Sequence, residues 1–304
     1  MPFSANSFTI EMKKTTKILF LLLLPFFALS QSQKRELDSL HLSLRNTAND
    51  TVRMIILMNI VGYYVERNRD STMDYAENAI AIAKKINQPL WVANFLLLKS
   101  YLNQKQANLV LSLKFCNEAL GIANDIRNEK NVFIPKDEEF ANDPAKFRRT
   151  ITLSGLHQLG NIYWIGGNKE KAIDYFKMEI QGSYELNTQN FRVTSNMAIG
   201  SIYLEMNKPD SALVYSKRAL ENVEHSKWKI YEGSILRDIG TIYFKRGLPD
   251  TAKYYLQRAI AVNRERYNVA GEIGSNNSLA DLYEKEKQPD SMLYYASGAL
   301  VLAS

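Results

Sequence analysis

Small and apolar residues recur every 40 positions along much of this chain. The clearest motif returns as Leu159-Gly160-Asn161-Ile162-Tyr163, Ile199-Gly200-Ser201-Ile202-Tyr203 and Ile239-Gly240-Thr241-Ile242-Tyr243, with a variant copy at Leu279-Ala280-Asp281-Leu282-Tyr283. The pairs Ala219-Leu220, Ala259-Ile260 and Ala299-Leu300 keep the same step. A fixed period of this length is typical of a solenoid, in which each unit packs on its neighbours.

Each unit contains two segments with the apolar spacing of a helix, separated by a short polar turn. A proline opens the second segment at Pro209, Pro249 and Pro289. Proline is favoured there because the first helical residue has no N–H partner to lose. No strand-like alternation persists anywhere, so the chain is predicted to be all-α.

The repeat extends towards the N-terminus in a weaker form. Ala79 and Ala119 continue the alanine column, which predicts two degenerate repeats over 51–127 and four clearer ones over 151–304. The next member of the column, Glu179, follows Ala119 by 60 residues instead of 40. The extra residues predict an insertion loop over 128–150. Such a loop is either a solvated excursion or a segment that folds over one face and contributes to binding.

The N-terminal 30 residues have the pattern of an export signal. Lys13, Lys14 and Lys17 precede an apolar run from Ile18 to Leu29, and small residues follow at the cleavage position. The run is shorter than the roughly 20 residues that a membrane-spanning helix needs. We therefore predict a signal peptide over 1–30, with Met12 as the true start. It would export the protein to the periplasm or the outer face of a bacterium.

A short amphipathic helix is predicted to follow the signal. Leu37, Leu40 and Leu44 have helical spacing within residues 31–50. We expect this segment to cap the first repeat.

Composition and motifs argue against several classes of function. The net charge is only +6, with 38 basic and 32 acidic residues spread along the chain, so a nucleic-acid interface is not expected. Cys116 is the only cysteine and the three histidines lie far apart, so neither a metal site nor a cofactor is predicted. No nucleophile motif or phosphate-binding glycine loop is present. The chain is therefore not expected to be an enzyme.

The repeated residues resemble those of the tetratricopeptide repeat, whose two helices carry a Leu-Gly pair, then Tyr, Ala, an aromatic residue and Ala. Within 230–269 the matching positions are Leu236, Ile239, Gly240, Tyr243, Ala252, Tyr255 and Ala259. The resemblance implies a right-handed α-solenoid of about six helix-turn-helix repeats. The step of 40 exceeds the usual 34 of the family, so longer helices are expected, as in extended variants. Glu179 and Met292 depart from the pattern by replacing two signature alanines.

The same resemblance implies that a protein or peptide partner binds in a concave groove lined by the first helix of each repeat. The residues expected to face that groove are His157, Asn161, Trp164, Met197, Ser201, Leu204, Arg237, Thr241, Phe244, Asn277 and Asp281. Their mixture of aromatic and hydrogen-bonding groups suits an extended or helical segment.

Two functions fit these observations. The first is an exported interaction scaffold. The second is the extracytoplasmic sensor region of a truncated signal-transduction protein, either a histidine kinase or a membrane-tethered transcription regulator, because no polar cap follows the last repeat. The second interpretation requires a membrane-spanning segment after Ser304. Translation of the DNA beyond that codon distinguishes the two.

Overall fold

The computed structural model describes residues 34–135, 143–224, 226 and 228–303, and these residues form helices and turns without a strand. The all-α prediction is confirmed. The chain divides into two compact units, Met1–Phe95 and Leu96–Ser304, and the division falls within helix α4 (Pro89–Gln104). No helix among the described residues has the length and apolarity to cross a membrane. The predicted signal peptide over 1–30 lies outside the described residues.

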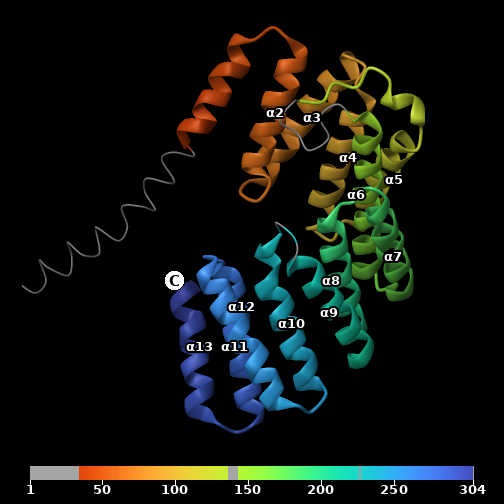
Figure 1. Cartoon of the computed structure of the whole chain (residues 1–304). Coiled ribbons are helices and arrows are strands. Elements are labelled where there is room, and N and C mark those ends of the chain that lie inside the picture. Colours follow the sequence, from red (N-terminus) through yellow and green to blue (C-terminus); the bar gives the residue numbers. More distant parts are fainter. Residues whose placement is uncertain (1–33, 136–142, 225, 227, 304) are drawn as a thin grey trace, which may run out of the picture. The chain divides into compact units, whose positions relative to one another are not determined.

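The first unit contains a helix over residues 34–46, followed by α2 (Asp50–Tyr64) and α3 (Arg69–Lys85) (Figure 1). Leu37 from the first of these helices is buried with Ile56 and Ile60 of α2, and Leu40 and Leu44 pack against the same cluster. The amphipathic spacing read from the sequence therefore places its leucines against the first repeat.

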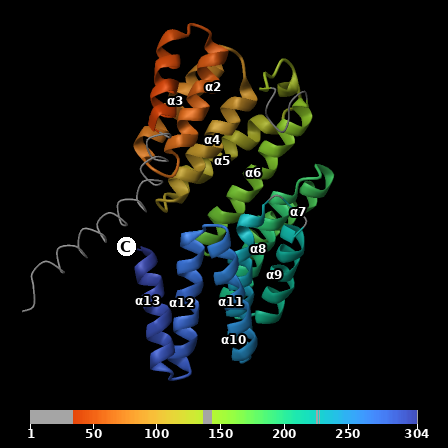
Figure 2. The ribbon, with the colours of Figure 1, turned by 60° about the vertical axis from the view of Figure 1, so that its left-hand side comes forward.

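The second unit continues with helices that alternate between two positions in each repeat. We call α6 (Pro144–Ile165), α8 (Gln189–Glu205), α10 (Glu232–Lys245) and α12 (Val269–Lys285) the A helices. The B helices are α5 (Leu109–Ala123), α7 (Lys169–Glu185), α9 (Pro209–Glu224), α11 (Pro249–Glu265) and α13 (Pro289–Ala303). Each A helix packs against the B helix that follows it and against the next A helix, and B helices α5, α7, α9 and α11 pack against the next A helix (Figures 1 and 2).

Glycines in the A helices allow the close approach of the paired B helix, as expected. A Cβ atom on Gly160 would lie 2.7 Å from the ring of Phe176, and one on Gly240 would lie 2.8 Å from Cγ of Leu256. Both of these neighbours are buried. A glycine inside a helix costs about 1 kcal/mol relative to alanine, so this packing offsets an intrinsic penalty.

Stacked tyrosine pairs fill the space between the helices of each repeat. One ring comes from the A helix and the other from the B helix, with centroids 5.3–5.5 Å apart. The pairs are Tyr163–Tyr175, Tyr203–Tyr215, Tyr243–Tyr255 and Tyr283–Tyr295. Offset stacking of this kind adds to the stabilisation that burial of the rings provides.

The turns between helices also follow the period of 40. Gly167, Asn207, Gly247 and Lys287 all have a positive φ, and each lies directly after an A helix. In each turn the next backbone N–H donates to the carbonyl of the A-helix tyrosine, as in Asn168 to Tyr163 at 2.8 Å. This bond satisfies a carbonyl that the helix end would leave unpaired.

The predicted insertion loop over 128–150 extends too far. Residues 126–129 form a 3₁₀ helix, η1 (Ile126–Glu129), and α6 begins at Pro144, capped by Asp143. Some charged residues of this segment are paired. Nε of Arg148 lies 2.6 Å from Oε1 of Glu129, and its Nη1 donates to the carbonyl of Ala123 at 2.9 Å. Residues 136–142 lie outside the described residues.

The glycine contacts predict opposite effects for two matched substitutions. Gly160→Ala should destabilise the protein, because overpacking against the buried Phe176 ring costs about 1–3 kcal/mol and exceeds the gain in helix propensity. Gly121→Ala in α5 should stabilise it by about 0.5–1 kcal/mol, because nothing lies within 4 Å of the added methyl group. Urea unfolding of both variants measures the difference. Equal effects would contradict the close-approach explanation.

Candidate functional site

The residues predicted to line the groove lie along the A helices and are partly or fully exposed. Within each helix they are three to four residues apart, which places them on one face, and adjacent A helices pack side by side. We call this set the A-helix face. It comprises His157, Asn161 and Trp164 of α6, Met197, Ser201 and Leu204 of α8, Arg237, Thr241 and Phe244 of α10, and Asn277 and Asp281 of α12.

Three of these residues line a common cavity between α10 and α12. Thr241, Phe244 and Asp281 surround a space of about 430 Å³. Leu256 of α11 lies beneath it and is 1% exposed. The remaining lining residues are Lys245, Ser278 and Lys285. An apolar floor with hydroxyl groups and charges of both signs suits one large apolar side chain of a ligand with polar groups beside it.

Other predicted residues serve partly to hold the helices together. The indole N–H of Trp164 donates to Oε2 of Glu205 at 3.1 Å, and Nζ of Lys169 lies 3.0 Å from the same oxygen. Met197 and Leu204 pack against the core between α8 and α10. Because Trp164, Met197 and Leu204 take part in contacts between helices, less of α6 and α8 is available to a ligand than the sequence alone suggested.

Arg237 reaches from α10 towards α12. Its Nη2 lies 3.1 Å from Oδ1 of Asp238, and a Cβ atom on Gly274 would lie 2.7 Å from its Nη1. The guanidinium group therefore occupies the space that Gly274 leaves open. It remains partly exposed and can still meet a ligand.

A buried polar cluster joins α6, α7 and α8. Nδ1 of His157 lies 3.0 Å from Oε2 of Glu179, and the hydroxyl of Ser195 lies 2.6 Å from the same oxygen. The Glu179 and Ser195 side chains are fully buried, whereas 28% of the His157 side chain is exposed. In the sequence, Glu179 is recognisable as a departure from the alanine column, which marks the site of this cluster. No sequence pattern connects Glu179 with His157.

The order of groups in this cluster does not favour nucleophilic catalysis. The carboxylate of Glu179 stands between the imidazole and the serine hydroxyl, so His157 is not placed to accept the proton of Ser195. Burial alone would lower the pKa of His157, but the Glu179 carboxylate outweighs it and raises the pKa above its usual range. The arrangement is that of a buried ion pair whose charge depends on pH.

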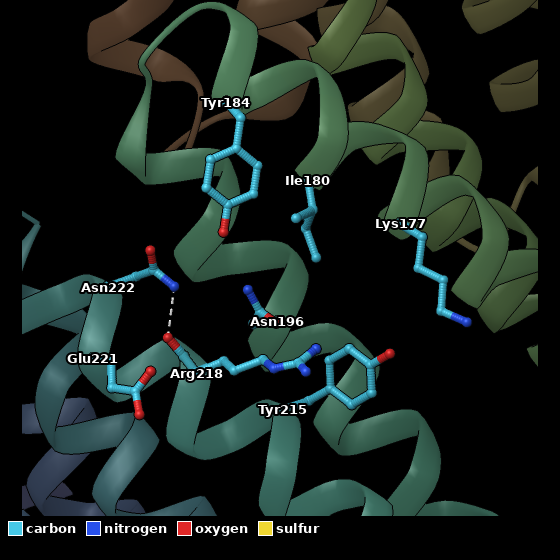
Figure 3. A pocket seen from close by; sticks show the side chains of 8 residues that line it. All are labelled: Lys177, Ile180, Tyr184, Asn196, Tyr215, Arg218, Glu221 and Asn222. Carbon is cyan, nitrogen blue, oxygen red and sulfur yellow. Dashed lines mark hydrogen bonds between the residues drawn. The ribbon is translucent and has the colours of Figure 1, made fainter.

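A second cavity lies between the B helices α7 and α9, with α8 beneath it (Figure 3). Its volume is about 550 Å³. Seven of its eight lining residues come from the B helices, and Asn196 of α8 is the exception. The others are Lys177, Ile180, Tyr184, Tyr215, Arg218, Glu221 and Asn222. None of these residues belongs to the predicted groove, and no sequence motif singles them out.

The described residues offer no obvious metal or thiol chemistry. They contain no group of three or more histidine, cysteine, aspartate or glutamate side chains placed to hold a metal ion. Cys116 is fully buried and its thiol donates to the carbonyl of Gly155 at 3.3 Å. Burial raises the pKa of this thiol to about 12, which keeps it protonated at neutral pH.

Comparison with known proteins supports the repeat assignment. The tetratricopeptide repeat model matches residues 153–177 and 193–222, which lie in α6 to α9. Among curated proteins, no sequence matches this chain. The helical architecture and the repeat spacing together identify a tetratricopeptide-like helical repeat fold.

Solved structures with similar folds agree. A Rap protein complexed with competence and sporulation factor superposes with a TM-score of 0.65 at 14% identity, over 90% of this chain and 71% of that protein. Aspartyl phosphate phosphatase F from Bacillus subtilis gives 0.64 at 16% identity, over 100% and 76%. BtubC from P. vanneervenii gives 0.61 at 15% identity, over 78% and 92%. At these identities the likeness concerns the fold alone.

The His157–Glu179 pair predicts a dependence of stability on pH. Because the folded-state pKa of His157 is raised, the pair contributes fully below the unfolded histidine value of about 6.5, and this contribution is lost as pH rises through the folded value. An NMR titration should therefore give a midpoint for His157 above about 6.5.

Glu179→Gln should lower that midpoint. In urea unfolding, the variant should lose part of the extra stability that the wild type has at acidic pH. Glu170→Gln is the control, because Glu170 is an exposed carboxylate on the same helix. An identical His157 midpoint in the wild type and Glu179→Gln would contradict the assigned pairing.

Proposed function

We propose that this protein is an exported interaction module that holds a peptide or a short helix of a partner protein on its A-helix face. The observation that carries the proposal is the cavity between α10 and α12, where Phe244 and Leu256 provide apolar surface beside Thr241 and Asp281. A peptide side chain anchored there would leave its neighbours in contact with the adjacent A helices.

The chemistry of this face favours a protein ligand. Recognition of a helix or an extended segment needs an apolar pocket for an anchor residue and polar groups that fix its orientation. The cavity has both, and Lys245, Lys285 and Asp281 can pair with charges next to the anchor. Arg237 lies on the same helix as Phe244 and extends this polar surface.

A structural neighbour gives this proposal additional support. The Rap protein with a similar fold was crystallised in complex with competence and sporulation factor, so this helical architecture accommodates a bound partner. The low sequence identity does not carry that ligand over to this chain. We propose only that the shared architecture serves binding here as well.

Binding rather than catalysis also agrees with the buried polar groups. The most concentrated set of catalytic residue types is His157, Glu179 and Ser195, and its carboxylate lies between the other two groups. This arrangement does not activate Ser195 as a nucleophile, which agrees with a binding function for the surface.

Export is the second part of the proposal and rests on residues 1–30. A fusion of residues 1–50 to alkaline phosphatase lacking its own signal should give phosphatase activity in a bacterial host, because that enzyme requires the oxidising periplasm to form its disulfides. Replacing Lys13, Lys14 and Lys17 with glutamate should abolish the activity. An inactive wild-type fusion that is confined to the cytoplasmic fraction would contradict export.

The binding site can be tested with peptides selected from a random library on the full chain. Phe244→Ala should weaken a selected peptide about tenfold or more, because an aromatic side chain in a central pocket often contributes more than about 1 kcal/mol. Trp164→Ala and Arg237→Ala should weaken it as well. Fluorescence anisotropy measures each affinity, and circular dichroism verifies folding.

Tyr267→Ala is the matched control, because Tyr267 is 91% exposed in the turn before α12 and lies outside the A-helix face. Selected peptides that lose no affinity with Phe244→Ala, Trp164→Ala and Arg237→Ala would place the site elsewhere on the molecule.

A further inference from the structure

The packing of the helices leaves a recurring groove between successive B helices. Since the close packing runs from A to A and from A to B, an A helix forms the floor of each such groove. Cavities of about 400, 550 and 490 Å³ lie at this place beside α7, α9 and α13 respectively. Asn196 and Asn276, which are 80 residues apart, occupy the same floor position in the second and third.

The groove between α7 and α9 differs from the groove between α11 and α13 in whether the buried charged residue of its A helix has an ion-pair partner. In the α11–α13 groove, the buried Glu272 is paired with Arg264 at 2.6 Å. The equivalent residue of α8 is Arg192, which is 7% exposed. Its guanidinium group lies over the ring of Tyr184 at 4.6 Å, and its Nε has no hydrogen-bond partner among the described residues.

The rim of the same groove adds further positive charge. Lys177 and Arg218 line it, and the guanidinium group of Arg218 lies 5.2 Å from the ring centroid of Tyr215. Glu221 is the single acidic lining residue. Within the part of the chain that the structure describes, no carboxylate forms an ion pair with Arg192, Lys177 or Arg218. The groove is therefore electropositive, and Lys177 and Arg218 on its rim are available to a ligand.

Two asparagines give the groove hydrogen-bond acceptors. Nδ2 of Asn196 donates to the carbonyl of Arg192 at 2.7 Å, and Nδ2 of Asn222 donates to the carbonyl of Arg218 at 2.6 Å. Each amide oxygen is left to accept a bond from a ligand, and Figure 3 shows both side chains beside the open space between Tyr184 and Arg218. A backbone N–H of an extended segment is a suitable donor.

We propose that the groove between α7 and α9 binds an acidic segment of a partner protein. Carboxylates of the segment would pair with Arg218 and Lys177, and its backbone N–H groups would donate to Asn196 and Asn222. Tyr184, Tyr215 and Ile180 supply surface for the side chains between the carboxylates. Tyrosine and arginine are the residues most enriched at the centres of protein interfaces. This surface is separate from the A-helix face, so the inference goes beyond the function proposed above.

The test uses the full chain and a short fluorescein-labelled peptide of alternating glutamate and leucine, with the lysine–leucine peptide as its counterpart. The wild type should bind the acidic peptide and not the basic one. Arg218→Glu and Lys177→Glu should each weaken binding about tenfold or more, because they replace an attractive charge with a repulsive one. Circular dichroism verifies that both variants fold.

Arg258→Glu is the matched control for charge. Arg258 is 40 residues after Arg218, is also exposed, and also lies over a tyrosine ring, that of Tyr254 at 5.7 Å. In the 40-residue register, the fully buried Leu236 of α10 stands where Asn196 lies in the α7–α9 groove, so no amide acceptor is present there. Arg258→Glu and Phe244→Ala should therefore leave the affinity for the acidic peptide unchanged.

Three results would overturn the proposal. The first is that the wild type does not bind the acidic peptide. The second is that Arg258→Glu weakens binding as much as Arg218→Glu, which would indicate that the peptide responds to general surface charge. The third is that inorganic phosphate displaces the peptide through the same residues, which would indicate a small-anion site. None of these results bears on the Phe244 pocket, so the two binding proposals fail independently.

Discussion

Close approach between the two helices of each repeat is the constraint on which the structure depends. Gly160 and Gly240 lie where a methyl group would overlap a buried side chain of the partner helix. Ala219 and Ala259 are fully buried at the joints with the next repeat. These small residues set how near the helices come. The tyrosine stacks fill the remaining space between the two helices. This packing fixes how each helix is rotated, and therefore which of its residues are exposed.

Polar residues take part in local networks within this packing, as at Glu179 and at Asn263. Glu179 takes the place of an alanine and draws in His157 and Ser195. Asn263 of α11 is 1% exposed, and its amide is 3.3 Å from the hydroxyl of Ser275 and 3.0 Å from the amide of Asn268. A buried polar group is tolerated only when its hydrogen-bond partners are present. Glu179 and Asn263 therefore each depend on the polar residues around them.

The sequence was most informative where one residue type recurs at one place. The period of 40 predicted the helices and marked the glycine and tyrosine positions at which they pack, because packing there depends on local size. The family resemblance also selected Thr241, Phe244 and Asp281 as groove residues, and these three share a cavity. The sequence could not reveal the groove between α7 and α9, because Tyr184, Asn196 and Arg218 come from three helices and match no motif. The helical start of α6 was missed because its charged residues resemble a loop until their partners are known.

The Glu179 cluster has a consequence for how the array unfolds. In a linear array, cooperativity depends on the coupling free energy between neighbouring repeats, and a weak joint allows the two flanks to melt separately. At the joint between α7 and α8, Glu179 meets Ser195 of α8 and also pairs with His157 of α6, whereas the equivalent joints at Ala219 and Ala259 are apolar. Coupling across this one joint therefore varies with proton concentration. The second unit thus contains one joint at which protonation of His157 changes the contacts of a buried carboxylate.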